Sequence, residues 1–290
     1  MPLTDWEDFS FQGIGTGWVI TTPLPMSPSL RARLLDRVEK FDADWSRFRT
    51  DSLVADLARA PGRYGFPDEA AALGGLYSQL YRATGGAMTP LIGVSLERLG
   101  YDAGYSLRPA GPALPAPAWE SVLTWSGTVL TATAPVVLDI GAAGKGLLVD
   151  LLAGELEAAG VGGFVIDASG DLLARGTEPV AVALEHPYNA AQAIGTINLD
   201  GQALCASAAN RRAWGDGLHH VLDGTTGQPV RTAVATWALA ETAMVADALA
   251  TALFFVPGAT LQETFDFSWL TVFSDGSAAY SAEFEGSLFS

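Results

Sequence analysis

Positive charge and cysteine are scarce in this chain of 290 residues. Its 16 Lys and Arg are outnumbered by 32 Asp and Glu, which gives a formal net charge of −16. This balance argues against nucleic acid or an anionic membrane as a partner, so any bound phosphate must be held by local donors or a metal ion. A single cysteine, Cys205, excludes an internal disulfide and a cysteine-rich metal site. Between Leu204 and Ala206 it is predicted to be a small buried residue.

Long uncharged apolar runs are also missing. The most apolar long segment, residues 236–256, contains Glu241 and Asp247, so it is predicted to be a buried helix and not a membrane span. Residues 1–15 contain acids and lack the apolar run of a signal peptide, and we therefore expect a cytoplasmic protein.

With 49% hydrophobic residues and a mean hydropathy of +0.24, the chain can bury a large core. We expect one domain over residues 1–290, built from two intertwined lobes if the proline-rich residues 103–118 form a connection.

The spacing of apolar residues predicts a mixture of helices and strands. Helices are expected over residues 28–44, 67–84 and 238–255, strands over 13–21 (with a glycine kink), 179–184 and 194–199, and hairpins over 122–133 and 269–284. His186 precedes a proline and is expected to be a loop residue. The polar cluster at residues 46–52 is consistent with a solvated loop.

Residues 136–172 form the central unit of the chain. A β-branched run at 136–140 predicts a buried strand, three glycines around Lys145 predict a turn that opens a helix, and residues 164–166 predict a second strand. Free amide groups at the start of a helix, together with a lysine, favour phosphate as a ligand. The glycines match neither the dinucleotide fingerprint nor the phosphate-loop motif, so a tight turn with a solvated lysine is the alternative.

Two further clusters concentrate polar groups. Residues 211–230 place His219, His220 and Asp223 around a Thr-Gly turn, where the alternative is a polar turn with one structural histidine. Asp247 and Thr251 are four residues apart and therefore share one face of an apolar helix. Their hard oxygens suit Mg²⁺, whereas a capping or arginine-paired role for Asp247 is the alternative.

The order of these motifs resembles that of the ApbE family, the FAD:protein FMN transferases. The resemblance rests on Gly15-Thr16, SRFRTDS, TGGAMTP, LDIGAAGKGLLVD with FVIDASGD, HHVLDGTTGQPV and ADALATALF, and it extends over about residues 13–272. It implies a two-lobed α+β, T-fold-like architecture with mixed or antiparallel sheets, flanking helices and a cleft between the lobes.

The resemblance also implies an activity. The protein would bind FAD with Mg²⁺ in the cleft and transfer the FMN part to a Thr or Ser hydroxyl of a client protein, releasing AMP. With water in place of the client hydroxyl, the same site would be an FAD pyrophosphatase. A non-catalytic FAD-binding protein is a third hypothesis.

Residue by residue, the resemblance assigns catalytic roles to His220 and Asp247, and metal-binding roles to Asp247, Thr251 and the backbone carbonyl of Gly144. Because neighbouring side chains on a strand point to opposite faces, His219 is left to packing or solvent. The implied FAD-binding residues are Gly15, Thr16, Ser46, Ala87, Met88, Asp139, Lys145, Asp171, Ser207, His220, Thr226 and Gly227.

The chain departs from the family pattern at four places, all of them around the flavin or adenine and not at the metal pair. The departures are Met88-Thr89 for Phe-Asp, Ala206-Ser207-Ala208 for Thr-Ser-Gly, Asp223-Gly224 for Asp-Pro, and Ala58 for asparagine.

Overall fold

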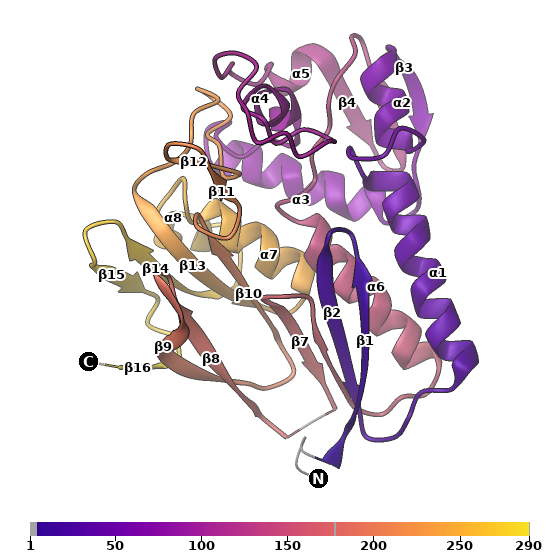
Figure 1. Cartoon of the computed structure of the whole chain (residues 1–290), viewed down its shortest axis with the longest axis vertical. Helices are drawn as coiled ribbons and strands as arrows, with labels where there is room; N and C mark the ends of the chain where they lie inside the picture. Colours follow the sequence, from indigo (N-terminus) through magenta and orange to yellow (C-terminus); the bar gives the residue numbers. More distant parts are fainter. Residues whose placement is uncertain (1–4, 177, 290) are drawn as a thin grey trace.

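An eight-stranded sheet forms the centre of the protein, a computed structural model of which describes residues 5–176 and 178–289. The sheet order is β1-β2-β6-β7-β10-β13-β14-β15, and each of these pairings is antiparallel (Figure 1). The strands are β1 (Glu7–Gly13), β2 (Thr16–Thr22), β6 (Phe164–Asp167), β7 (Asp171–Arg175), β10 (Ala203–Ala208), β13 (Ala233–Ala240), β14 (Ser268–Phe273) and β15 (Ala278–Tyr280). An antiparallel sheet of this kind, together with the helices of the chain, confirms the predicted α+β class.

Two layers cover the opposite faces of this sheet. Helices α6 (Gly144–Ala158) and α7 (Ala243–Ala252) pack on one face, and a small antiparallel sheet of β8 (Val180–His186), β9 (Asn189–Leu199) and β16 (Ser287–Leu288) packs on the other (Figure 1). Because successive side chains of a strand point to opposite faces of the sheet, each strand contributes side chains to both layers. In β10, Ala203 and Cys205 join the helix-side core, whereas Leu204 joins the core under the small sheet. Cys205 is buried, as predicted.

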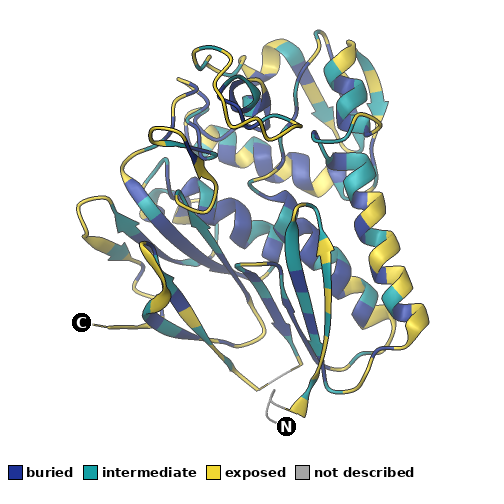
Figure 2. Ribbon diagram, viewed as in Figure 1, coloured by how far each residue is buried: buried dark blue, intermediate teal, exposed yellow. Residues whose placement is uncertain are grey.

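Most of the remaining elements form the helical end of the molecule. The full set is α1 (Pro28–Trp45), α2 (Leu53–Arg59), α3 (Ala70–Ala83), the 3₁₀ turn η2 (Pro90–Ile92), α4 (Gly93–Arg98), α5 (Trp119–Val122), α8 (Gly258–Gln262), and a third sheet of β3 (Gly62–Gly65), β4 (Leu123–Ser126) and β5 (Val129–Ala132). Helix α8 instead packs against Trp269 of β14, and α1 runs along α6 (Figure 1). A short hairpin pairs β11 (Ala213–Trp214) with β12 (Leu218–His219). Buried side chains line the side of α1 that faces α6 (Figure 2).

Three sequence predictions differ from the structure. Residues 136–140 do not join a sheet: they are an extended segment whose Asp139 amide donates to the Pro90 carbonyl at 2.8 Å. Val136, Leu138 and Ile140 are nevertheless buried, which explains the strand-like alternation. Residues 13–21 are not one kinked strand but the turn and second strand of the β1–β2 hairpin, since Ile14 and Gly15 both have positive φ, 43° and 80°.

The third difference concerns the predicted helix over residues 238–255. Its first part belongs to strand β13, and helix α7 begins only at Ala243. Strand β13 lies inside the sheet and is covered on both faces, so its sequence is apolar except for Thr236 and has no strand periodicity. Thr242 caps α7 by accepting the amide of Val245. Within the described part of the chain, no helix is long and apolar enough to cross a membrane.

The proline-rich stretch is an extended surface connection, as predicted. Contacts near both ends fix it: the Leu107 amide donates to the Gly100 carbonyl at 2.8 Å, and the Ala116 amide donates to the Gly224 carbonyl at 2.8 Å. Its role as a boundary between lobes stays a prediction, as does a single domain over residues 1–290. Residues 1–4 of the N-terminal stretch lie outside the described residues.

Helices α6 and α7 come into direct contact at Gly146. A Cβ atom at this position would lie 2.1 Å from the Ala243 carbonyl oxygen and 2.8 Å from the Asp247 Cβ. Glycine therefore allows the first turn of α6 to contact the first turn of α7 directly.

We predict that Gly146→Ala destabilises the fold by at least about 1–3 kcal/mol, because the new methyl group must displace backbone. Gly154→Ala is the matched control in the same helix: no atom lies within 4 Å of its added Cβ, so it should be neutral or stabilise by up to about 1 kcal/mol. Urea unfolding measures both. Equal stability of the two variants would contradict the close-contact interpretation.

Candidate functional site

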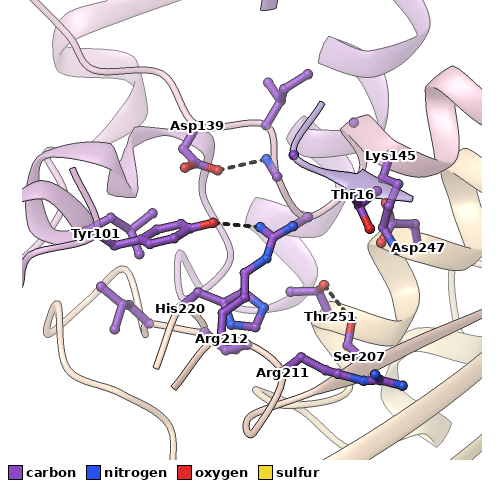
Figure 3. A pocket seen from close by; sticks show the side chains of 18 of the residues that line it. Thr16, Tyr101, Asp139, Lys145, Ser207, Arg211, Arg212, His220, Asp247 and Thr251 are labelled. Carbon is purple, nitrogen blue, oxygen red and sulfur yellow. Dashed lines mark hydrogen bonds between the residues drawn. The ribbon is translucent and has the colours of Figure 1, made fainter. Parts of the chain in front are cut away.

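A cavity of about 910 Å³ opens where the eight-stranded sheet meets the helical end of the molecule. This volume lies at the upper end of the range for small-molecule sites and suits a ligand of dinucleotide size. Most residues predicted to form the site line it: Gly15, Thr16, Ser46, Ala87, Met88, Asp139, Gly144, Lys145, Ser207, His220, Asp247 and Thr251. Figure 3 shows the central ones.

Three predicted residues do not line the cavity. Asp171 is fully buried behind it, on β7. Thr226 and Gly227 belong to a turn in which the Gly227 amide donates to the Asp223 carbonyl, and Gly227 packs against the backbone of Leu114. This turn therefore packs against the proline-rich connection and lies behind the residues that line the cavity.

Buried charges form the deepest part of the site. The Lys145 ammonium lies 2.9 Å from an Asp171 carboxylate oxygen, and both side chains are largely excluded from solvent. Burial alone would lower the pKa of Lys145, but the Asp171 and Asp247 carboxylates outweigh it and raise that pKa. Lys145 is therefore a partly buried cation held by Asp171, and not the solvated lysine that was the alternative from the sequence.

Asp247 is the second buried carboxylate. Its Oδ2 accepts the Gly146 amide at 2.9 Å, so it contributes to the N-terminal cap of α6, as one sequence alternative had it. Burial, with the nearby Asp171 carboxylate, raises the pKa of Asp247 well above its ordinary value, against the opposing effect of Lys145. When ionised, the two carboxylates and one ammonium carry a net charge of −1, and this favours a further cation.

Thr251 lies one helical turn from Asp247 on α7, and both line the cavity. Its hydroxyl is 3.2 Å from the Ser207 hydroxyl at the end of β10, a contact drawn in Figure 3. The predicted pair thus points into the same space as Lys145. Across the described residues, no group of three or more His, Cys, Asp or Glu side chains could hold a metal by itself.

The two histidines face opposite ways, as predicted. His219 is buried outside the cavity, with its Nε2 2.8 Å from the Val230 carbonyl, whereas His220 lines the cavity. Burial, then the charge of Arg212 and the neighbouring His219, lower the pKa of His220 to about 3. His220 is therefore neutral near pH 7.

Arg47, which the sequence indicates only as part of a polar cluster, forms an ion pair with Asp139. Arg47 is buried, and its Nε lies 2.5 Å from the Asp139 carboxylate. Burial would raise the pKa of Asp139, but Arg47 and the Gly141 amide hold it below its ordinary value. In the same loop Arg49 is more exposed and pairs with Asp51, so the solvated-loop interpretation holds for part of the cluster.

Sequence reasoning missed an aromatic wall beside this pair. Phe48 stacks on Tyr105 at 5.1 Å between ring centroids, and Tyr101 stacks on Trp214 at 5.7 Å. These residues come from three distant segments, so no local pattern marks them. Arg212, which donates to the Tyr101 hydroxyl at 2.8 Å, was missed as well, although it stands eight residues before His220 in a motif that we had singled out.

Two of the departures from the family pattern contact each other. The Gly224 amide donates to the Ala87 carbonyl at 2.7 Å, a bond that a proline at this position lacks. A Cβ at Gly224 would lie 2.5 Å from the Thr89 methyl group. Gly224 therefore packs directly against Thr89, which lines the cavity.

A family model described as the ApbE family matches residues 14–267 of the chain. The chain belongs to the ApbE family. The ordered motifs had indicated this membership, and the match confirms it.

Curated relatives match over part of the chain. Proteins named FAD:protein FMN transferase from Rhodobacter capsulatus, Klebsiella pneumoniae and Salmonella typhimurium are 34%, 32% and 30% identical to it. The matches cover 45%, 40% and 47% of this chain and 26%, 36% and 41% of those proteins. The chain thus spans less than half the length of the curated relatives it matches.

Solved structures match over nearly the whole fold. The ApbE protein of Thermotoga maritima has a TM-score of 0.83 at 21% identity and covers 97% of this chain and 99% of its own. The flavin transferase ApbE from Vibrio cholerae has a TM-score of 0.78 at 20% identity, with 96% and 98% coverage. The family architecture that the sequence implied is confirmed.

The low pKa of His220 predicts how stability changes with pH. The pKa of His220 is about 6.5 in the unfolded chain and about 3 in the folded chain. The unfolded state therefore binds more protons between these pH values, and the free energy of unfolding decreases as the pH falls from about 6.5 to about 3. We expect His220→Gln to lose less stability than the parent between pH 7 and pH 4, by on the order of 1–3 kcal/mol. Urea unfolding at three pH values measures the difference, and parallel curves would contradict it.

Proposed function

We propose that this protein transfers the FMN part of FAD to a threonine or serine hydroxyl of a client protein and releases AMP. One observation carries the proposal: Lys145, Asp247 and Thr251 meet a neutral His220 in one cavity large enough for a dinucleotide. Curated relatives bear the name of this activity, which supports the same conclusion.

Mg²⁺ fits the residues present. A buried carboxylate whose pKa is raised lacks a sufficient counter-charge, and Asp247 is such a group. Asp247 and Thr251 supply hard oxygens, and the Gly144 carbonyl is the third proposed ligand. So few protein ligands match an ion that takes its other ligands from water and substrate phosphates. When bound, Mg²⁺ would neutralise charge on the phosphate oxygens.

The chain's own residues account for the rest of the reaction. Lys145, held by Asp171, presents a fixed positive charge to the diphosphate. His220 takes the proton of the client hydroxyl while its oxygen forms the new bond to the FMN phosphorus. The bond from that phosphorus to the AMP oxygen breaks, and AMP leaves with the electron pair. Water in place of the client hydroxyl would give FMN and AMP.

The decisive experiment separates the outcomes. The protein is incubated with FAD and Mg²⁺, with and without candidate client peptides, and AMP and peptide-bound flavin are measured. We expect AMP release that depends on the peptide and equals the flavin attached. AMP without attached flavin would favour the pyrophosphatase, and FAD binding without AMP would favour a non-catalytic flavin-binding protein.

Asp247→Asn tests the metal role. The amide keeps the shape and can still accept from Gly146, but it loses the charge, so we expect AMP release to fall by at least on the order of 10²-fold across a Mg²⁺ titration. Because the charged form is costly to bury, stability in urea should be unchanged or higher. Wild-type turnover at every Mg²⁺ concentration would rule the role out.

His220→Ala and His219→Ala form a matched pair. His220 lines the cavity and His219 does not, so only the first should lose flavin transfer, by on the order of 10²-fold or more, while FAD still binds. His219→Ala should mainly lower stability, since its ring contacts the Val230 carbonyl. Equal kinetic losses in the two variants would point to a metal-activated hydroxyl without a histidine base.

A further inference from the structure

Arg212 differs from the other arginines near the cavity. Arg47 pairs with Asp139 at 2.5 Å, and Arg211 pairs with Glu185 at 2.8 Å. Among residues 5–176 and 178–289, no carboxylate lies within 4 Å of the Arg212 guanidinium to form an ion pair. In a chain with twice as many acids as bases, a cation without such a partner is available for an anionic ligand.

The guanidinium is directed into the cavity. Figure 3 shows it between Tyr101 on one side and Lys145 and Asp247 on the other. Figure 3 also shows His220 beside Arg212, whose charge contributes, after burial, to lowering the pKa of His220.

Tyr101 holds Arg212 in this position. The phenol oxygen accepts a hydrogen bond from Arg212 Nη1 at 2.8 Å, and the ring is 5% exposed, stacked on Trp214. Burial raises the pKa of Tyr101 to about 12, so the phenol stays neutral and binds the guanidinium as an acceptor without cancelling its charge. One nitrogen of the fork is thus used for anchoring, and the remaining N–H groups are left for a ligand.

We propose that Arg212 binds the diphosphate of FAD from the side of the cavity across from Lys145 and Asp247, and that Tyr101 is its positioning residue. This inference rests on the proposed function. The planar fork of arginine matches phosphate oxygens with two parallel hydrogen bonds. As the hydroxyl attacks and AMP departs, negative charge grows on the oxygens of the diphosphate, and Arg212 stabilises it next to the base His220.

The test uses Arg212→Gln, Arg212→Lys and Tyr101→Phe, with Arg211→Gln as the control. Arg211 and Arg212 are both exposed and both line the cavity, but Arg211 is already paired with Glu185, so its loss should change the reaction far less. For each variant, calorimetry gives the Kd for ADP and for adenosine in the presence of Mg²⁺, and AMP release gives kcat and KM for FAD.

We expect Arg212→Gln to weaken ADP binding about tenfold or more and adenosine binding not at all, and to lower kcat/KM by on the order of 10²-fold or more. Arg212→Lys keeps the charge but loses the planar guanidinium, so its ADP affinity and kcat/KM should lie between those of the parent and of Arg212→Gln. Tyr101→Phe keeps the ring stack and should weaken ADP binding a few-fold, with adenosine again unchanged.

Two results would overturn the proposal: an Arg212→Gln protein that binds ADP as tightly as the parent, or an equal loss in Arg211→Gln. If the parent itself releases no AMP from FAD, the proposed function fails, while the ADP and adenosine measurements still decide the role of Arg212.

Discussion

The contact between Gly146 and the first turn of α7 sets the geometry on which the cavity depends. Helix α6 brings Lys145 and Gly144 to its N-terminus, and α7 carries Asp247 and Thr251. Since the Gly146 amide donates to Asp247 and no side chain separates the helices, the lysine and the carboxylate cannot move independently. Asp150 strengthens the same junction, because its carboxylate accepts the Ala243 and Met244 amides at 2.8 Å each.

Most elements could be predicted from the sequence because apolar periodicity reports burial on one side. Helix α1 and the β4–β5 hairpin have such one-sided patterns, and their predicted ranges agree with the structure. The pattern fails where burial is two-sided or is not caused by a sheet. Strand β13 is covered on both faces and therefore resembles a helix. The burial of residues 136–140 alternates like that of a strand, although they pack against α2, η2 and α4 and not in a sheet.

The candidate site also contains residues that the sequence predicts and residues that only the tertiary structure reveals. Lys145, Asp247, Thr251 and His220 stand in short motifs whose chemistry is local, and the fold brings them into one cavity. Tyr101 and Arg212 are 111 positions apart and acquire a joint function only through the tertiary structure. Asp171 shows the reverse case: its motif was recognised, but only the structure reveals that it acts on the cavity indirectly, through Lys145.

The scarcity of positive charge has a kinetic consequence. At low ionic strength a molecule of net charge −16 repels an approaching diphosphate at long range, whereas at physiological ionic strength this repulsion is screened beyond a Debye length of about 8 Å. Added salt screens this long-range repulsion more than it weakens partly buried contacts such as that of Lys145. Moderate ionic strength should therefore speed ligand capture, the opposite of the behaviour of enzymes that steer anions with a basic surface.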